Sequence, residues 1–398
     1  MKRFRFRSMI LTLPALLMLS SQAVGQAWPD VAQGCPHAFS SLGYASTCLY
    51  GLLADEPIHL ATNRYIAPGD GTIGAVAHTT VDFSDDSAVR RLTAEAAVSD
   101  ALFWKLAMGF ELRPYVIGER EPFNATVVYK RLAHLTFFGL GPDTPEIPYD
   151  FAADEASVTF TKDKIITSWL RLRGEVGYDQ WRISASNDPS SVKANFTDAT
   201  APGITSQPRY LKYGLTARFH TEPVNDLLTV TEHFFEDISG QGASFFESDL
   251  VVQKNIYLDE DKGLKNGTLS LRLQINLLAA IHGAIPFYLQ RSIGGADIDG
   301  QETLRGFQDY RFRGTNDAVV QIEYDHVLLK DYLHGFLLFD AGQVAPSGAE
   351  LLRFDSLRHD VGAGLSLFLA GDSWLRAYVA FGGGEGVHAN LHFTVPVF

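Results

Sequence analysis

The sequence predicts an all-β chain that folds as a transmembrane antiparallel β-barrel of about sixteen strands. Three observations indicate this fold class. The chain begins with an export signal, no later segment offers about 18 uninterrupted apolar residues for a membrane-spanning helix, and the residues past position 70 alternate between apolar and other side chains. The expected location is the bacterial outer membrane.

Residues 1–25 have the features of a secretory signal that is cleaved before Gln26. A basic beginning precedes an apolar run over 9–19, which is too short to span a bilayer, and small residues stand before the cleavage point. Residues 1–25 are therefore excluded from the fold. The basic residues are Lys2, Arg3, Arg5 and Arg7, and the small ones are Ala23 and Gly25.

Residues 26–70 are expected to form a short periplasmic segment before a barrel over 71–398. The two cysteines of the chain, Cys35 and Cys48, lie in this segment. Because an exported chain meets an oxidising compartment, one expectation is a structural disulfide between them, and the alternative is two unpaired thiols in a flexible tail. His37 alone does not complete a metal site with them, so no metal and no cofactor are expected.

Alternation is clearest in the last expected strand. From Val387 to Val397 the odd-numbered residues are apolar, whereas the even-numbered residues from His388 to Thr394 are polar. Successive side chains of a strand point to opposite faces, so one face would contact lipid and the other the lumen. His388 and His392 are then polar groups of the lumen rather than metal ligands. A water-soluble sandwich that buries the apolar face against a second sheet is the alternative.

Fifteen segments of this kind can be assigned, and a closed barrel of this type normally has an even number of strands. The sixteenth strand is expected either at Ile58–Ala67 or within Leu135–Leu140. The fifteen expected strands lie near 72–83, 89–98, 102–112, 123–132, 154–166, 169–183, 208–221, 226–237, 244–257, 267–281, 315–327, 332–345, 357–370, 373–382 and 387–398.

The connections between the expected strands indicate an orientation. Leu328–Asp331 and Leu369–Asp372 are short turns, whereas the stretches 184–207 and 284–314 are long. Barrels of this class have short periplasmic turns and long extracellular loops, so the two long stretches are assigned to the outside.

The chain ends on an alternating strand and an aromatic residue, as outer-membrane barrels commonly do for recognition by the barrel assembly machinery. The expected C-terminal assembly signal consists of Phe393, Val395, Val397 and Phe398. Val395 and Val397 follow the alternation, but Phe398 has the opposite parity. The expected partners are therefore this machinery during biogenesis and the outer-membrane lipids.

The excess of acidic over basic residues argues against nucleic acid as a partner. The net charge of −13 becomes −17 when the four cations of the signal are removed. Binding of phosphate groups needs clustered Lys and Arg, which this balance does not provide.

Two carboxylates are expected to face the lumen on neighbouring strands. Glu323 lies opposite the apolar face of the strand over 315–327, and Asp340 lies opposite the apolar face of the strand over 332–345. Unpaired carboxylates would destabilise each other, and one guanidinium fork could satisfy both. Arg305 is the candidate. The alternative is that it sits on a solvated loop tip while both carboxylates are hydrated.

Residues 294–344 carry an ordered set of motifs. In order, these are Gly294-Gly295, Leu304-Arg305-Gly306-Phe307, Tyr310-Arg311-Phe312, Gly314, Gln321-Ile322-Glu323-Tyr324 and Phe339-Asp340-Ala341-Gly342-Gln343-Val344, preceded along the chain by Phe137-Phe138-Gly139-Leu140-Gly141-Pro142-Asp143-Thr144. The set resembles the C-terminal barrel of the bacterial surface antigen superfamily, to which BamA and TamA belong. The resemblance covers roughly residues 70–398.

The resemblance implies that the long extracellular loop folds back into the lumen, where Arg305 binds Glu323 and Asp340. Gly306 would allow a close backbone approach, and Phe307 would pack on the barrel wall. Such a lumen loop lock is structural and not catalytic.

The resemblance also implies a function in inserting or translocating proteins, or lipids, at the outer membrane. Relatives with this function carry periplasmic POTRA domains, and the segment 26–70 is too short for one. Unfolded client proteins and periplasmic partners acting in trans are therefore the expected partners. The alternative is a small-solute pore, or a structural or binding barrel without insertase activity. No set of nucleophile, base and oxyanion donors is apparent, so no enzymatic activity is expected.

Overall fold

The computed structural model describes most of the predicted barrel, beginning at Ile58. The signal sequence, Cys35 and Cys48 lie outside the described residues, as do Val397 and Phe398. The described ranges are 58–62, 73–84, 88–99, 102–114, 121–221, 226–261, 264–298, 300–329, 332–369 and 372–396.

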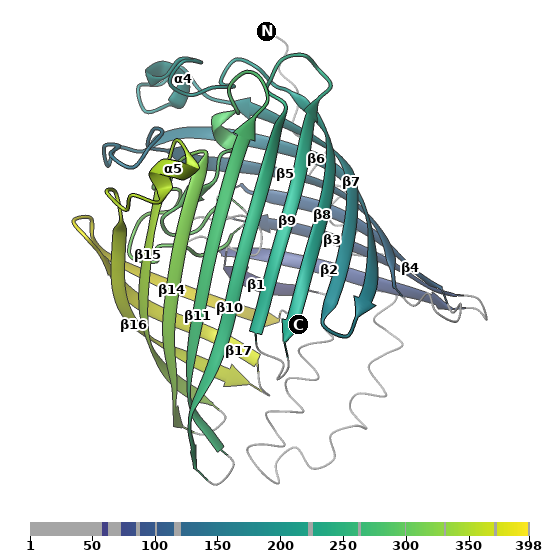
Figure 1. Cartoon of the computed structure of the whole chain (residues 1–398), viewed down its shortest axis with the longest axis vertical. Helices are drawn as coiled ribbons and strands as arrows, with labels where there is room; N and C mark the ends of the chain where they lie inside the picture. Colours follow the sequence, from purple (N-terminus) through teal and green to yellow (C-terminus); the bar gives the residue numbers. More distant parts are fainter. Residues whose placement is uncertain are drawn as a thin grey trace. The chain divides into compact units, whose positions relative to one another are not determined.

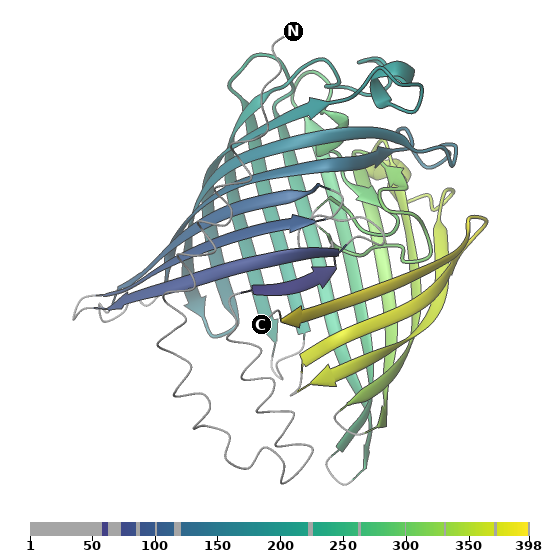
Figure 2. The same cartoon turned by 180° about the vertical axis from the view of Figure 1, so that it is seen from behind.

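The strands form a closed antiparallel barrel, which confirms the predicted fold class (Figures 1 and 2). Sixteen strands within the described ranges belong to the barrel, and a separate two-stranded sheet consists of β12 (Ser292–Ile293) and β13 (Phe312–Arg313). The barrel strands are β1 (Ile58–Thr62), β2 (Ile73–Ser84), β3 (Ala88–Ser99), β4 (Trp104–Pro114), β5 (Phe123–Phe137), β6 (Tyr149–Thr167), β7 (Leu170–Ser184), β8 (Arg209–Thr221), β9 (Asp226–Asp237), β10 (Phe245–Asp261), β11 (Leu264–Ala280), β14 (Asn316–Leu329), β15 (Leu333–Ala345), β16 (Arg358–Leu369), β17 (Asp372–Gly382) and β18 (Gly386–Pro396).

All fifteen strands expected from the alternation are present, most of them with shifted ends. The sixteenth is β1, at the first of the two predicted places, where it pairs with β2 and β18. Leu135–Leu140 instead contributes the end of β5, which continues to Phe137. The barrel therefore reaches back at least to Ile58, inside the predicted periplasmic segment, and does not begin at residue 71. With five residues, β1 is too short for its alternation to stand out in the sequence.

Alternating burial along the strands separates an outer face from an inner face. On β15, Leu337 is 60% exposed and Phe339 38%, whereas Leu338 is 4% exposed and Asp340 is fully buried. Apolar side chains on the outside suit contact with lipid, and the buried polar side chain points into the lumen. No helix within the described ranges is long and apolar enough to cross a membrane.

Most connections at one end of the barrel are short, and the longest connections lie at the other end. β6 and β7 are joined through residues 168–169 and β10 and β11 through 262–263, whereas 185–208 join β7 and β8. The connection between β11 and β14, residues 281–315, is the longest among the described elements. We call it the lumen loop, because most of its residues are buried and lie inside the ring of strands (Figure 2). The asymmetry agrees with short periplasmic turns and long extracellular loops.

Among the described residues, the barrel closes between β1 and β18 along a seam of three residue pairs, whereas β17 and β18 are paired over eight. Pro396 has no backbone N–H, so the seam also lacks one potential hydrogen-bond donor. It is the shortest strand pairing of the barrel among those whose register is described. The three pairs are His59 with Pro396, Leu60 with Val395, and Ala61 with Thr394.

Candidate functional site in the barrel lumen

Arg305 lies in the lumen loop, and its guanidinium reaches two carboxylates on the barrel wall. Its Nε and Nη2 donate to the two oxygens of Asp340, each at 2.7 Å, and its Nη1 donates to Glu323 Oε2 at 2.5 Å. The backbone N–H of Arg305 donates to Asp340 Oδ2 at 3.1 Å. Arg305 is only 6% exposed. The structure thus places together the three charged residues of the predicted lock.

The electrostatics of this contact favour the ionised state of Arg305. Burial works against its charge, but the hydrogen bonds and charge of Asp340, followed by those of Glu323, outweigh burial and hold the pKa of the guanidinium above its usual value. The bidentate geometry fixes both the position and the orientation of the loop, which a point charge could not do.

Two further charged residues of the wall join this cluster, and the sequence analysis did not include them. Arg376 on β17 donates to the same oxygen of Glu323 at 2.6 Å, and its guanidinium lies 3.8 Å from the ring centre of Phe336. Asp360 on β16 is paired in register with Asp340. Alternation alone places Arg376 and Asp360 on the lumen face. Their proximity to Arg305 becomes visible only when the strands are assembled.

Gly306 and Phe307 bring the loop close to the wall. A Cβ atom on Gly306 would lie 2.5 Å from the Cβ of Asp360 and 2.6 Å from the backbone nitrogen of Gly382, so this position has no room for a side chain. Phe307 is buried in an apolar cluster that joins loop and wall. The other members of this cluster are Ile293, Leu304, Phe312, Val319 and Val344.

Glu302 connects the lumen loop to the strand at the seam. Its Oε1 accepts a hydrogen bond from the hydroxyl of Tyr378 on β17 and lies 3.1 Å from Nε2 of His392 on β18. The loop therefore contacts one of the two seam strands directly. His392 is a polar partner of the loop in this arrangement.

Arg311 anchors the loop to two other connections at the extracellular end. Its Nε donates to Glu385 Oε1 at 2.7 Å in the turn between β17 and β18, and its Nη1 and Nη2 donate to the side-chain and backbone oxygens of Thr144 at 2.7 and 2.8 Å. The guanidinium also lies 5.0 and 4.6 Å from the ring centres of Phe138 and Phe312. The glycine-containing motif before β6 thus contacts the lumen loop.

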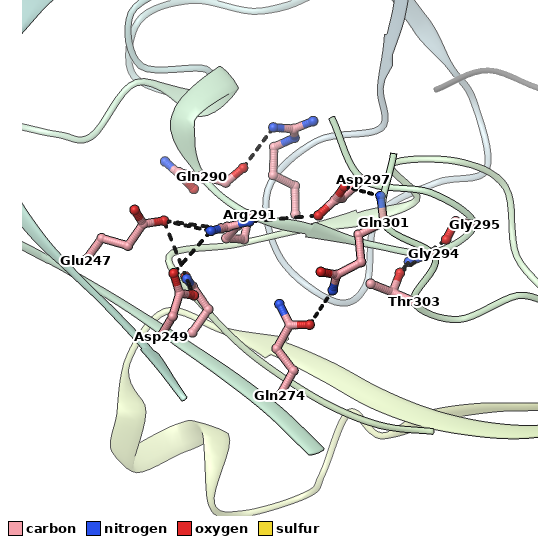
Figure 3. A network of polar contacts seen from close by, with 12 residues as sticks. Glu247, Asp249, Gln274, Gln290, Arg291, Gly294, Gly295, Asp297, Gln301 and Thr303 are labelled. Atoms are coloured by element: carbon pink, nitrogen blue, oxygen red, sulfur yellow. Dashed lines mark hydrogen bonds and ion pairs between the residues drawn. The ribbon is translucent and has the colours of Figure 1, made fainter. Parts of the chain in front are cut away.

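Arg291 anchors the loop to β10 (Figure 3). Its Nε lies 3.2 Å from Glu247 Oε1, and its Nη2 lies 3.3 Å from Asp249 Oδ2. Its Nη1 is 3.8 Å from Asp297 Oδ2 within the loop. Glu247 and Asp249, together with His233, place possible ligand atoms within 4.8 Å of one another. Since Arg291 binds both carboxylates, the geometry there is that of an ion-pair network and not of a transition-metal centre.

Arg313 connects two parts of the lumen loop. Its Nη1 donates to the carbonyl oxygens of Phe287 and Gln290 at 3.0 and 2.9 Å, and burial lowers its pKa to about 10. Four arginines of the lumen loop therefore fix it in the lumen. Arg313 fixes the shape of the loop, and Arg291, Arg305 and Arg311 bind it to the barrel strands and their connections. These contacts hold the connected strands together.

The remaining predicted site residues are only partly described. Phe393 on β18 pairs with Leu375 on β17, and Val395 pairs with Leu60 on β1. Val397, Phe398 and the two cysteines lie outside the described residues.

Comparison with solved structures shows the fold of bacterial outer-membrane β-barrels. BamA from Haemophilus ducreyi lacking POTRA domains 1–3 aligns with 85% of this chain and 69% of its own, with a TM-score of 0.58 and 12% identity. CdiB from Acinetobacter baumannii and from Escherichia coli align with 85% and 86% of this chain, with TM-scores of 0.50 and 0.52 and identities of 13% and 11%. This chain spans 59% and 63% of those two CdiB chains.

At identities this low, the comparisons establish a shared fold but not a shared family or function. No family model matches the sequence, and no curated protein matches it. The fold agrees with the predicted location in the bacterial outer membrane.

Proposed function

We propose that this chain assists the insertion or translocation of proteins, or of lipids, at the bacterial outer membrane. The observation that carries the proposal is the short seam between β1 and β18, three residue pairs among the described residues, in a barrel with the fold of BamA and CdiB. A barrel that serves only as a pore has no use for one weak junction, whereas a barrel that admits client strands needs one.

The short seam lowers the free energy needed to part β1 from β18. A backbone hydrogen bond contributes a net ~0.5–1.5 kcal/mol, so three residue pairs hold two strands far less firmly than the sixteen pairs between β10 and β11 do. Parting exposes unpaired N–H and C=O groups on both strands, and such an edge readily pairs with another strand. A client strand could therefore extend the sheet at the seam.

The lumen loop supports the β18 side of this seam. Glu302 contacts His392 on β18 itself, and Arg311 binds Glu385 in the turn that leads into β18. β1 pairs with β2 over only five residue pairs. These contacts support a division of roles in which β18 stays in place as a template and β1 moves.

The proposed clients are unfolded outer-membrane proteins, delivered by periplasmic partners that act in trans. A small-solute pore is the alternative, and it requires the lumen loop to leave the lumen against the contacts of Arg291, Arg305 and Arg311. Ion conductance across planar bilayers separates the two functions, since a steady open-channel current would favour the pore. We propose no enzymatic activity, because the buried lumen groups described here pair loop with wall.

The test is a disulfide that closes the seam. Leu60→Cys and Val395→Cys are introduced together, with Cys35 and Cys48 replaced by serine, and the protein is placed in liposomes. The folding rate of an unfolded outer-membrane barrel is then followed with the disulfide oxidised and reduced. We expect folding faster than with empty liposomes in the reduced state, and loss of this acceleration in the oxidised state.

A matched control carries the disulfide in a long strand pairing. Val320→Cys with Ala341→Cys joins β14 to β15, which does not border the seam. This pair should accelerate client folding equally in both redox states. An oxidised seam that works as well as the reduced one would show that opening at β1 and β18 is not required.

A further inference from the structure

The outer face of the barrel carries a row of charged residues towards the extracellular end of neighbouring strands. Arg131 on β5 is directly paired with Asp154 on β6, and Asp154 is directly paired with Arg182 on β7. Side chains of directly paired residues project to the same face of a sheet. Leu132 and Ile183, the next residues after the two arginines, are buried against the lumen loop, so the row itself faces outward.

A third arginine extends this outer row to β8. Arg209, the first residue of β8, is paired with Gln180 and is therefore the diagonal neighbour of Arg182 on the same face. Diagonal neighbours of a sheet lie roughly 7–8 Å apart, which is within the reach of two long side chains. Arg182 and Arg209 can thus approach one anion from two adjacent strands.

The positive charge of the outer row is compensated only in part by the protein. Nη1 of Arg131 donates to the two oxygens of Asp154 at 3.2 and 3.4 Å. Arg182 and Arg209 are exposed, and neither forms an ion pair with a carboxylate of the described ranges. On the outer face of β9, Glu236 is hydrogen-bonded to a tyrosine of β8. Two arginines therefore remain available to an external anion.

Below the outer row, towards the middle of the membrane, the outer face becomes apolar. Trp104 on β4 is paired in register with Arg131, and its ring centre lies 4.9 Å from that of Tyr129. Tryptophan and tyrosine concentrate at the boundary between lipid headgroups and acyl chains. The outer row therefore lies at the level of the headgroups of the outer leaflet. The large apolar side chains exposed below it are Leu106, Met108, Val127, Phe160, Val176 and Leu215.

Outward-facing cations of this kind are not spread evenly around the barrel. Among the described residues of β14 to β18, the alternation places no lysine or arginine on the outer face. A cationic side chain on the lipid face is costly unless it finds polar partners near the membrane surface. At this level of the outer face, the available partners for Arg182 and Arg209 are the headgroups of lipids.

We propose that Arg182 and Arg209, together with Arg131, bind the phosphate groups of an outer-leaflet lipid on the outer wall of β5 to β8. A guanidinium can form two parallel hydrogen bonds to a phosphate, which suits arginine to this ligand. The four adjacent strands spread the arginines over a width of about 14 Å, which fits a headgroup with two phosphates. The acyl chains cover the apolar residues below. The site is separate from the seam and does not depend on the proposed function.

The test uses the full, folded chain in detergent, freed of bound lipid by detergent exchange. Native mass spectrometry follows its titration with lipid A, a glycolipid with two phosphate groups, and with the same lipid after removal of both phosphates. We expect a saturable one-to-one complex with lipid A, and at least about tenfold weaker binding of the dephosphorylated lipid. Arg182→Ala combined with Arg209→Ala should weaken the binding of lipid A by at least about tenfold.

The matched control removes two arginines from the other face of the same two strands. Arg171 on β7 and Arg218 on β8 are directly paired and face the lumen. Arg171→Ala combined with Arg218→Ala removes the same charge and should bind lipid A as the wild type does. Unchanged affinity in the outer-face double variant, or equal affinity for the phosphorylated and dephosphorylated lipids, would overturn the proposal.

Two further measurements keep the outcome interpretable if the outer-face double variant folds poorly. Asp154→Asn frees Arg131 from its carboxylate and should bind lipid A more tightly than the wild type, so weaker binding would contradict the proposal. Inorganic phosphate at millimolar concentration should leave most of the lipid A complex intact. Complete displacement by inorganic phosphate would show a site for a free anion and overturn the assignment to a lipid.

Discussion

Gly306 and Gly382 meet backbone to backbone, so closely that a Cβ atom on Gly382 would overlap the carbonyl oxygen of Gly306. Gly306 belongs to the lumen loop and Gly382 ends β17. The absence of both side chains lets the loop lie directly on the wall, where Arg305 can reach Asp340. Close packing of two backbones is thus a condition for the buried ion pair.

Gly382→Ala should therefore displace the loop. Overpacking of this kind costs about 1–3 kcal/mol, and the unfolding temperature should fall accordingly. The neighbouring Gly383→Ala is the matched control, because a Cβ there would lie 3.6 Å from the nearest atom, an ordinary contact distance. Heat-induced loss of the folded form on gels measures both variants. Equal unfolding temperatures would show that the loop has more room than its backbone contacts indicate.

Arg305→Ala should destabilise the barrel by about 3–5 kcal/mol, because it leaves the fully buried Asp340 without its partner. Arg305→Lys retains the charge but loses the planar fork, so it should recover only part of this loss. The exposed Arg353→Ala serves as the control and should leave stability unchanged. Chemical unfolding and cleavage of the loop by added protease report the two effects. A lysine variant as stable as the wild type would contradict a requirement for bidentate geometry.

The turn between β17 and β18 should respond to pH through Glu385. Burial raises the pKa of Glu385 above its usual value, and the charge of Arg311 offsets this only in part. A carboxyl group whose pKa rises on folding stabilises the fold below its unfolded pKa, and this contribution is lost as the pH rises through the folded pKa. The wild type should therefore lose stability relative to Glu385→Gln over the pH range that begins near the ordinary glutamate pKa of about 4. Parallel unfolding curves of the two proteins across this range would exclude the effect.

Hydrogen exchange should distinguish the seam from the rest of the barrel. Amide groups of β1 should exchange faster than those at the centre of β10 and β11, because β1 is held by three residue pairs on one side and five on the other. Mass spectrometry of peptides from the folded protein measures the rates. Protection of β1 equal to that of β10 would mean that the seam is as stable as the other strand pairings.

The sequence located fifteen strands and both lumen carboxylates of the Arg305 contact. Alternation has a period of two residues and is a local property, so a strand and the faces of its side chains can be recognised without knowledge of its neighbours. Glu323 and Asp340 were placed in the lumen by this local pattern. Their pairing with Arg305 came from the family resemblance, since alternation says nothing about a loop.

The tertiary structure decided which lumen residues meet. Arg376 reaches Glu323 across two intervening strands, and Arg311 joins Thr144 to Glu385, because barrel closure brings these residues together. The seam depends in the same way on β1, whose five residues made it only one of two candidates for the sixteenth strand in the sequence. Side-chain direction along a strand follows from local chemistry. Contacts across the lumen follow from strand number, register and closure, which only the assembled barrel fixes.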